Sequence, residues 1–205
     1  DQSLRLITEV ADQLERGYRF WEILIVSESQ DDEKYLDVLS KINNIRVIRV
    51  KQYTDFYLKR SIVAMEAIGD IVVLTSITEV RHIDILEVVE RVRSTDKLVV
   101  IELPKFYLFN GFLKFIGRVA GFRASLQYML TSAYPRSILS QLLSESRSQV
   151  GLRFPPLYLG KPEIINVSIK SSRTNSSFTR RIALVQDLLF SLAPRLLKYV
   201  GTLCI

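Results

Sequence analysis

The fold is decided by one segment, Ala64-Met65-Glu66-Ala67-Ile68-Gly69-Asp70-Ile71-Val72-Val73-Leu74-Thr75-Ser76-Ile77-Thr78-Glu79. Its sequence is typical of the end of a helix, a glycine that stops the helix, a buried strand and then a polar turn. In an α/β sheet, ligands bind beside the carboxyl ends of the strands. We therefore expect any functional chemistry around residues 76–79, a turn that holds a single acid, Glu79.

Other apolar runs of strand length flank this segment, at residues 22–27, 45–50 and 98–101. Stretches in which apolar residues recur at helical spacing separate them, notably residues 54–68 and 83–92. Thr54 is the expected N-cap of the first of these helices. Strands that alternate with helices in this way predict an α/β fold with a mostly parallel sheet flanked by helices.

The second half of the chain has a different character. Residues 105–118 combine five aromatic side chains with three cations and no acid. The stretch up to residue 123 fits either a core element, with Phe112 and Leu113 packed on the sheet, or a membrane surface, where aromatics and cations together favour anionic head groups. We expect the membrane surface. Further on, we predict a helix that begins at Pro135, a last strand at residues 164–169 and an amphipathic helix from residue 182.

Composition limits the classes of protein and of partner. The 205 residues are 48% hydrophobic with a net charge of +6 and a pI near 9.5, which favours a globular domain that attracts anionic partners. A single cysteine and a single histidine exclude a disulfide framework and a histidine-rich zinc site. No apolar run is long enough to span a membrane. We recognise no RNA- or DNA-binding module and do not expect nucleic acid as a partner.

Several segments then occur in a recognisable order. They are Glu-Ile-Leu-Ile-Val-Ser-Glu-Ser-Gln-Asp-Asp at residues 22–32, Glu-Ala-Ile-Gly-Asp-Ile-Val-Val-Leu-Thr at 66–75, Tyr-Pro-Arg-Ser-Ile-Leu at 134–139, and the strand, basic loop and helix of residues 165–201. Their order and spacing resemble the family-2 glycosyltransferases of the GT-A type, in particular those that act on polyprenyl phosphates, such as dolichyl-phosphate mannosyltransferase.

The resemblance implies a Rossmann-like GT-A fold with amphipathic C-terminal helices. Residues 1–104 would form the nucleotide-sugar-binding half of the domain, and residues 105–205 the half that faces the acceptor and the membrane. The implied activity is transfer of a sugar from a nucleotide-sugar to a polyprenyl-phosphate lipid, on the inner, cytoplasmic face of the membrane by a peripheral protein.

The resemblance also assigns candidate site residues. Those implied for the nucleotide-sugar are Glu28, Asp32, Asp70, Ser76 and Thr78, and those for phosphate are Arg136, Arg173 and Ser176. The implied cofactor is Mg²⁺ or Mn²⁺, hard cations that prefer oxygen ligands, with Glu79 as the metal ligand. No catalytic base is assigned, because no acid lies between residues 121 and 135, where the family has one.

The family's acidic motifs are depleted in this chain. Ser27-Glu28 stands in place of paired aspartates, Ser76-Ile77-Thr78 in place of Asp-x-Asp, and Ser176-Ser177-Phe178 in place of Ser-Lys-Tyr. The alternative function is therefore a catalytically inactive glycosyltransferase-like subunit that binds a protein partner or a lipid.

Each candidate also has a structural interpretation. Glu28 and Asp32 would be acids that stabilise the start of a helix, and Glu79 would be a surface acid of a loop. Asp70 would hydrogen-bond loop amides, and the basic loop around Arg173 would be a solvated segment.

Overall fold

A computed structural model describes residues 2–28, 37–39, 41–103, 110–145 and 148–167. The helices that lie entirely in this part of the chain are α1 (Gln2–Gly17), α3 (Phe56–Glu66), α4 (Ile77–Val80), α5 (Ile85–Thr95), α6 (Asn110–Ala120), α7 (Arg136–Leu143), α8 (Ser148–Gly151) and the 3₁₀ turn η1 (Leu157–Leu159), and residues 37–39 are also helical. The strands are β1 (Ile23–Ser27), β2 (Ile45–Arg49), β3 (Ile71–Leu74), β4 (Val99–Glu102), β5 (Tyr128–Pro135) and β6 (Glu163–Asn166).

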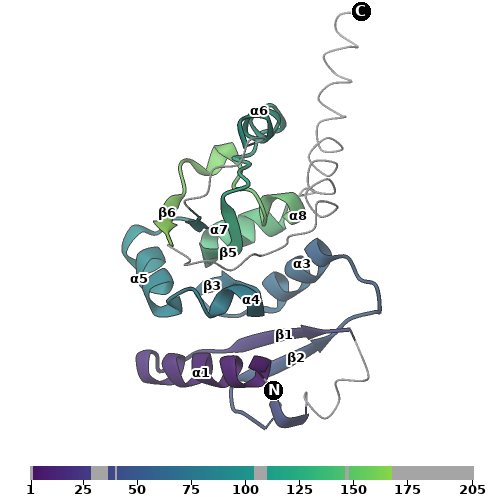
Figure 1. Ribbon diagram of the computed structural model, residues 1–205, viewed down its shortest axis with the longest axis vertical. Helices are drawn as coiled ribbons and strands as arrows, with labels where there is room; N and C mark the ends of the chain where they lie inside the picture. The colour runs from purple at the N-terminus through teal and green to yellow at the C-terminus, as the bar shows by residue number, and fades with distance from the viewer. Residues whose placement is uncertain (1, 29–36, 40, 104–109, 146–147, 168–205) are drawn as a thin grey trace, which may run out of the picture.

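The described strands form two sheets. β1 and β2 pair in parallel as a small sheet, and the larger sheet has the order β3-β5-β4-β6. β6 is parallel to β4, whereas β5 runs antiparallel to both of its neighbours, β3 and β4. Figure 1 shows the small sheet, with α1 beside it, at one end of the molecule and α6 at the other end.

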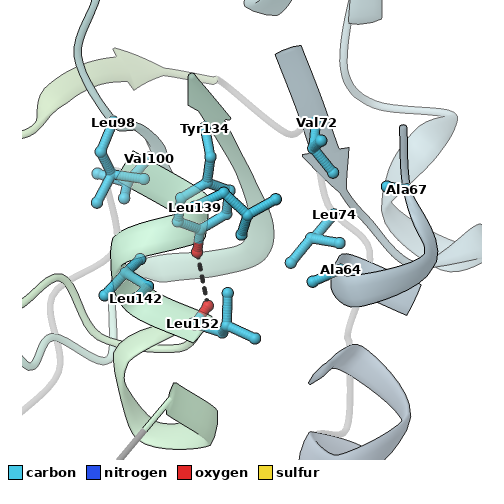
Figure 2. Packing of buried hydrophobic residues seen from close by; sticks show 10 residues of the cluster. All are labelled: Ala64, Ala67, Val72, Leu74, Leu98, Val100, Tyr134, Leu139, Leu142 and Leu152. Atoms are coloured by element: carbon cyan, nitrogen blue, oxygen red, sulfur yellow. Dashed lines mark hydrogen bonds between the residues drawn. The ribbon is translucent and has the colours of Figure 1, made fainter. Parts of the chain in front are cut away.

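Helices cover both faces of the larger sheet. On one face, α3, α7 and Leu152 pack against β3, β4 and Tyr134 of β5, forming the core cluster drawn in Figure 2. On the other face, α5 packs through Val88 and Val92 against Val99, Ile101 and neighbouring apolar residues. The burial of both faces follows from the near-continuous apolar character of β3 and β4.

The expected α/β fold is confirmed, and so are its predicted strands. Residues 22–27, 45–50, 71–75 and 98–101 correspond to β1, β2, β3 and β4, and the strand expected at 164–169 begins as β6. The sheet is mixed because of β5, which sequence analysis did not predict. The amphipathic helix expected from residue 182 lies outside the described residues.

Two helix starts differ from expectation in detail. α3 begins one residue later than predicted, because the Asp55 carboxylate, and not Thr54, accepts the backbone N–H groups of Tyr57 and Leu58. The Thr54 hydroxyl donates instead to the carbonyl of Lys51. Pro135 closes β5 and caps α7 from outside the helix, so the helix itself begins at Arg136.

The second half of the chain completes the sheet of the first half. β5 and β6, which come from residues 105–205, pair with β3 and β4, which come from residues 1–104. The carboxyl ends of β3, β4 and β6 and the amino end of β5 therefore share one edge of the sheet. This edge carries residues 76–79, where the predicted turn takes the form of the single helical turn α4, which Ser76 precedes.

Candidate functional site

Helix α3 brings the carboxyl ends of β1 and β3 together. Near its start, Lys59 forms an ion pair of 2.9 Å with Glu28, the residue that follows β1. The next residue, Arg60, donates from Nη2 to the Ser132 hydroxyl at 3.1 Å, and Ser132 pairs with Leu74 at the end of β3. The first half of α3 thus borders an edge shared by both sheets.

The turn after β3 presents hydroxyl groups at this edge. The hydroxyls of Ser76 and Thr78 hydrogen-bond to each other at 3.0 Å. The Thr75 hydroxyl bonds to that of Thr131 on β5 at 2.7 Å. Of the residues expected to contact a nucleotide-sugar, the structure therefore places Glu28, Ser76 and Thr78 around the start of α3 and the end of β3.

Glu79 is bound to strand β5. One carboxylate oxygen accepts the backbone N–H of Leu130 at 2.9 Å, and the other accepts the backbone N–H and the hydroxyl of Thr131 at 2.8 and 2.7 Å. These hydrogen bonds link the segment after β3 to the antiparallel strand β5. Because β3 has ended by this point, Glu79 satisfies amides of β5 that have no partner on β3.

The described donor set fits a divalent cation poorly. Both oxygens of Glu79 already accept hydrogen bonds, and no group of three or more His, Cys, Asp or Glu side chains within the described ranges could hold a metal ion. Mg²⁺ and Mn²⁺ need several oxygen ligands in close geometry. Glu79 as a metal ligand stays a prediction.

The buried Arg60 and the partly buried Arg153 both contact strand β5. Arg60 is 6% exposed and also donates to the Leu152 carbonyl at 3.3 Å, and Arg153 donates to the carbonyls of Met129 and Tyr128 at 3.0 and 2.9 Å. Burial, together with the nearby charge of Arg60, lowers the pKa of Arg153. Within the described part of the chain, neither guanidinium forms an ion pair with a carboxylate, so this region carries a positive potential.

The other predicted residues are not part of this edge as the structure describes it. Asp70 immediately precedes β3, and its carbonyl accepts the backbone N–H of Arg136 at 2.7 Å. Both residues therefore lie at the amino end of β3, on the opposite edge of the sheet. Their predicted roles draw no support from this placement. Asp32, Arg173 and Ser176 lie outside the described residues.

Sequence reasoning missed Lys59, Arg60, Thr131 and Arg153. Lys59 and Arg60 form a basic pair in the first turns of a helix, which alone does not distinguish a solvated face from a site. Thr131 and Arg153 reach the region through contacts between segments far apart in the chain. The one usable signal was the pair of basic residues preceding a run of small and apolar helix residues at 61–64.

The helix within the aromatic and basic stretch, α6, has apolar residues on its outer face. Phe112 is 59% exposed and Phe115 is 66% exposed, whereas Leu113 and Ile116 are buried. The stretch thus contributes to the core through one side and to the surface through another. No described helix is long and apolar enough to cross a membrane.

Comparisons with known proteins support the fold. Among solved structures, the chain is similar to 4-diphosphocytidyl-2C-methyl-D-erythritol synthase from Anaerococcus prevotii, with a TM-score of 0.53, 13% identity, and coverage of 93% of this chain and 87% of that chain. Neither protein-family models nor curated proteins gave a match. At this identity the likeness shows the fold alone.

Proposed function

We propose that this chain is a glycosyltransferase-type protein that binds a nucleotide-sugar at the shared edge of its sheets and serves a polyprenyl-phosphate acceptor at a membrane surface. The observation that carries the proposal is the set of contacts of α3: Lys59 pairs with Glu28, which follows β1, and Arg60 bonds to Ser132 beside the end of β3, the strand that Ser76 and Thr78 follow. Ligands of α/β proteins bind at such an edge.

The fold supports a nucleoside-diphosphate ligand by analogy. The synthase to which it is similar has a diphosphocytidyl group in its name, which is the nucleoside cytidine joined to a diphosphate. In this chain, Glu28 would accept hydrogen bonds from the base or the ribose. Lys59, released in part from Glu28, would pair with a diphosphate oxygen, since charge-assisted hydrogen bonds of this kind are among the strongest in proteins.

The proposed reaction accounts for the lack of an assigned base. An oxygen of the acceptor phosphate attacks the anomeric carbon of the sugar, and the bond from that carbon to the diphosphate breaks. The electron pair of the broken bond leaves with the nucleoside diphosphate. A phosphate monoester has its second pKa near 6, so its oxygen is already ionised at neutral pH and needs no side chain to remove a proton. The leaving diphosphate gains negative charge, which Lys59 and the positive potential of the buried arginines stabilise.

Calorimetry with the full chain tests the proposal. We expect a UDP-, GDP- or CDP-sugar to bind, and Lys59→Met to weaken that binding roughly tenfold or more, because one charge-assisted contact is lost. Lys51→Met, at an exposed lysine elsewhere on the surface, is the matched control and should leave binding unchanged. Titrations with Mn²⁺ and with a chelator show whether a metal contributes to donor binding. If Glu79 is a ligand of that metal, Glu79→Gln should abolish the effect of Mn²⁺ on binding. Binding of none of these donors would contradict the proposal.

The engagement of Glu79 by β5 favours a second candidate, the inactive glycosyltransferase-like subunit. A turn whose single carboxylate is used for structure has lost the acids that the family places there. Transfer of labelled sugar from a bound donor to a polyprenyl phosphate separates the two functions. Donor binding without transfer would support the inactive subunit, and transfer would exclude it.

A further inference from the structure

Helix α6 buries one face against the domain and presents aromatic and basic side chains on the rest of its surface. Leu113, Ile116 and Ala120 are buried against the domain. Phe112 and Phe115, three residues apart, form an exposed aromatic face. Gly111, Lys114, Phe115 and Arg118 follow the helical spacing of three and four residues and line one wall of a pocket.

The pocket lies between α6, the start of β5 and η1. Its volume is about 360 Å³, and its walls include Lys114, Arg118, Arg123, Phe122, Tyr128 and Leu157. Three cations line it and no acid does. Within the described residues, no carboxylate forms an ion pair with any of these three cations.

The walls of the pocket are fixed by contacts from several elements. Arg153 donates hydrogen bonds to the carbonyls of Tyr128 and Met129. Asn110, at the start of α6, bonds through its amide to Gln127 at 2.7 Å and to the backbone N–H of Leu126 at 2.9 Å. Arg123 donates to the carbonyl of Gly160 at 3.1 Å, just beyond η1. The site is therefore pre-formed, which reduces the entropic cost of binding.

Tyr128 joins the pocket to the shared edge of the sheet. It pairs with Glu102 at the carboxyl end of β4, and it precedes Thr131, the residue bonded to Thr75, by three positions. At about 3.4 Å per strand residue, the pocket lies roughly 10 Å along β5 from the hydroxyl cluster. Burial, and then the charge of Glu102, raise the pKa of Tyr128. A tyrosine hydroxyl is protonated at neutral pH even at its ordinary pKa of about 10, so that of Tyr128 can donate a hydrogen bond.

We propose that this pocket binds the phosphomonoester head group of a membrane lipid, while Phe112 and Phe115 lie in the acyl boundary of the bilayer. The inference rests on the proposed function and deepens it, because a polyprenyl phosphate belongs to this class of lipid. Charge complementarity identifies the occupant: Lys114, Arg118 and Arg123 face a dianionic phosphate, and an aromatic face beside them suits the interface between head groups and acyl chains. The volume falls at the small end of the range for ligand pockets, which suits a phosphate better than a large sugar.

Vesicle co-sedimentation of the full chain at low salt tests the inference. Phosphatidylcholine vesicles that contain phosphatidic acid, a phosphomonoester lipid, are compared with vesicles brought to the same surface potential by oleic acid, a carboxylate lipid. We expect tighter binding to the phosphatidic acid vesicles. The double variant Lys114→Ala/Arg118→Ala should bind them about 25-fold more weakly, since each cation contributes roughly fivefold near an anionic surface. It should also lose the preference for phosphate over carboxylate.

Matched controls separate the pocket from overall charge. Lys51→Ala/Lys97→Ala removes the same charge from exposed positions outside the pocket and should keep the preference. Phe115→Ser should weaken binding to both kinds of vesicle, whereas Phe20→Ser, at a site that is 84% exposed, should not. Circular dichroism confirms that each variant is folded.

Two results would overturn the inference. One is equal binding to the phosphate and carboxylate vesicles, and the other is an equal loss in the pocket variant and the charge control. Because the assay contains no nucleotide-sugar, it succeeds or fails independently of donor binding. A chain that binds phosphatidic acid but no donor would refute the proposed function and leave the lipid pocket standing.

Discussion

At the scale of single residues, Glu79 links the turn after β3 to β5. Three hydrogen bonds from Leu130 and Thr131 end on its carboxylate. Without them, the backbone N–H groups of β5 would lose their acceptors beyond the end of β3, and an unpaired buried amide destabilises the folded state.

We predict that Glu79→Ala lowers the free energy of unfolding by about 2–3 kcal/mol, because hydrogen bonds to a charged acceptor are lost and two amides are left without partners. Glu79→Gln should lose less, since its amide oxygen still accepts. Urea denaturation measures both changes. Glu66→Ala, which removes an exposed acid at the end of α3, is the control and should change stability little. Equal stability of Glu79→Ala and the wild-type chain would contradict the role as a link.

A second residue, Tyr134, is fully enclosed in the core. Its hydroxyl donates to the Leu152 carbonyl at 2.8 Å, as Figure 2 shows, and lies 2.9 Å from the Ser132 hydroxyl. Burial raises the pKa of Tyr134 above its ordinary value of 10.0. The folded state therefore favours the protonated phenol.

For Tyr134→Phe we predict a loss of about 1 kcal/mol in unfolding free energy at neutral pH, from the lost hydrogen bond. The stabilisation that comes from the raised pKa of Tyr134 is fully present below about pH 10 and is lost as the pH rises further, because the unfolded chain then ionises first. Wild-type stability should accordingly fall more steeply than that of the variant above about pH 10. Tyr53→Phe, at a tyrosine that is 89% exposed, should retain the wild-type slope. If stability depends on pH with the same slope in wild type and in Tyr134→Phe above about pH 10, the raised pKa of Tyr134 is refuted.

At the scale of elements, α6 approaches the chain after it closely. A Cβ on Gly117 would lie 2.5 Å from the Cβ of Ala124 and 2.9 Å from its backbone nitrogen. Both distances are shorter than the non-bonded contacts that Cβ atoms make in proteins. Gly111, in the same helix, has nothing within 4 Å of an added Cβ. The two glycines therefore form a matched pair.

We expect Gly117→Ala to lower the melting temperature, because α6 must move away from Ala124 and part of its buried face is exposed. Gly111→Ala should raise it or leave it unchanged, since alanine favours helix by roughly 1 kcal/mol over glycine when nothing clashes. Thermal unfolding followed by circular dichroism measures both. A loss of equal size in the two variants would show that the close approach at Gly117 does not hold α6.

Strand β5 shows why one element escaped prediction. Its sequence, Tyr-Met-Leu-Thr-Ser-Ala-Tyr-Pro, has no alternation of apolar and polar residues, because both of its faces are covered. Thr131 and Ser132 are buried there with partners from distant segments. In the sequence, Thr131 and Ser132 look like residues of a polar loop. Their burial is favourable only because partners from distant segments satisfy their hydroxyl groups.

At the scale of the whole molecule, Glu22 connects the small sheet to the end of helix α3. Its carboxylate accepts the backbone N–H of Ile68, just after α3, at 2.7 Å and pairs with Arg46 of β2 at 3.0 Å. Arg46 also donates to the carbonyl of Glu66 at 2.8 Å. These contacts join β1 and β2 to the end of α3, and so to the larger sheet.

We predict that Glu22→Ala loosens the small sheet locally. Amide hydrogen exchange in β1 and β2 should speed up several-fold, while β4 and β5 exchange at the wild-type rate, because local opening involves only the contacts that are broken. Hydrogen exchange followed by mass spectrometry measures the change. Glu9→Ala, which breaks an exposed ion pair on α1, is the control and should alter neither sheet. Uniform acceleration in both sheets would instead mean that Glu22 supports global stability.

The sequence alone determined the local elements and the place of the site. The strands β1 to β4, the helices α3 and α5, and the turn after β3 follow from the spacing of apolar residues and from glycine and cap signals, which act between near neighbours. Those signals placed the candidate site at residues 76–79, whereas Glu28, Ser76 and Thr78 were chosen from the resemblance to a known family; the structure places these three residues at the carboxyl ends of β1 and β3.

The tertiary structure decided what each candidate residue contacts. Glu79 bonds to a strand 52 residues away, and Arg60 bonds to Ser132 across 72 residues, so no local pattern could reveal either contact. Asp70 lies at the amino end of β3 because it precedes that strand, but only the antiparallel direction of β5 places Arg136 beside it and the start of β5, with the basic pocket of α6, on the edge that holds residues 76–79. Strand order depends on which buried faces pack together, and that choice is made by the whole chain.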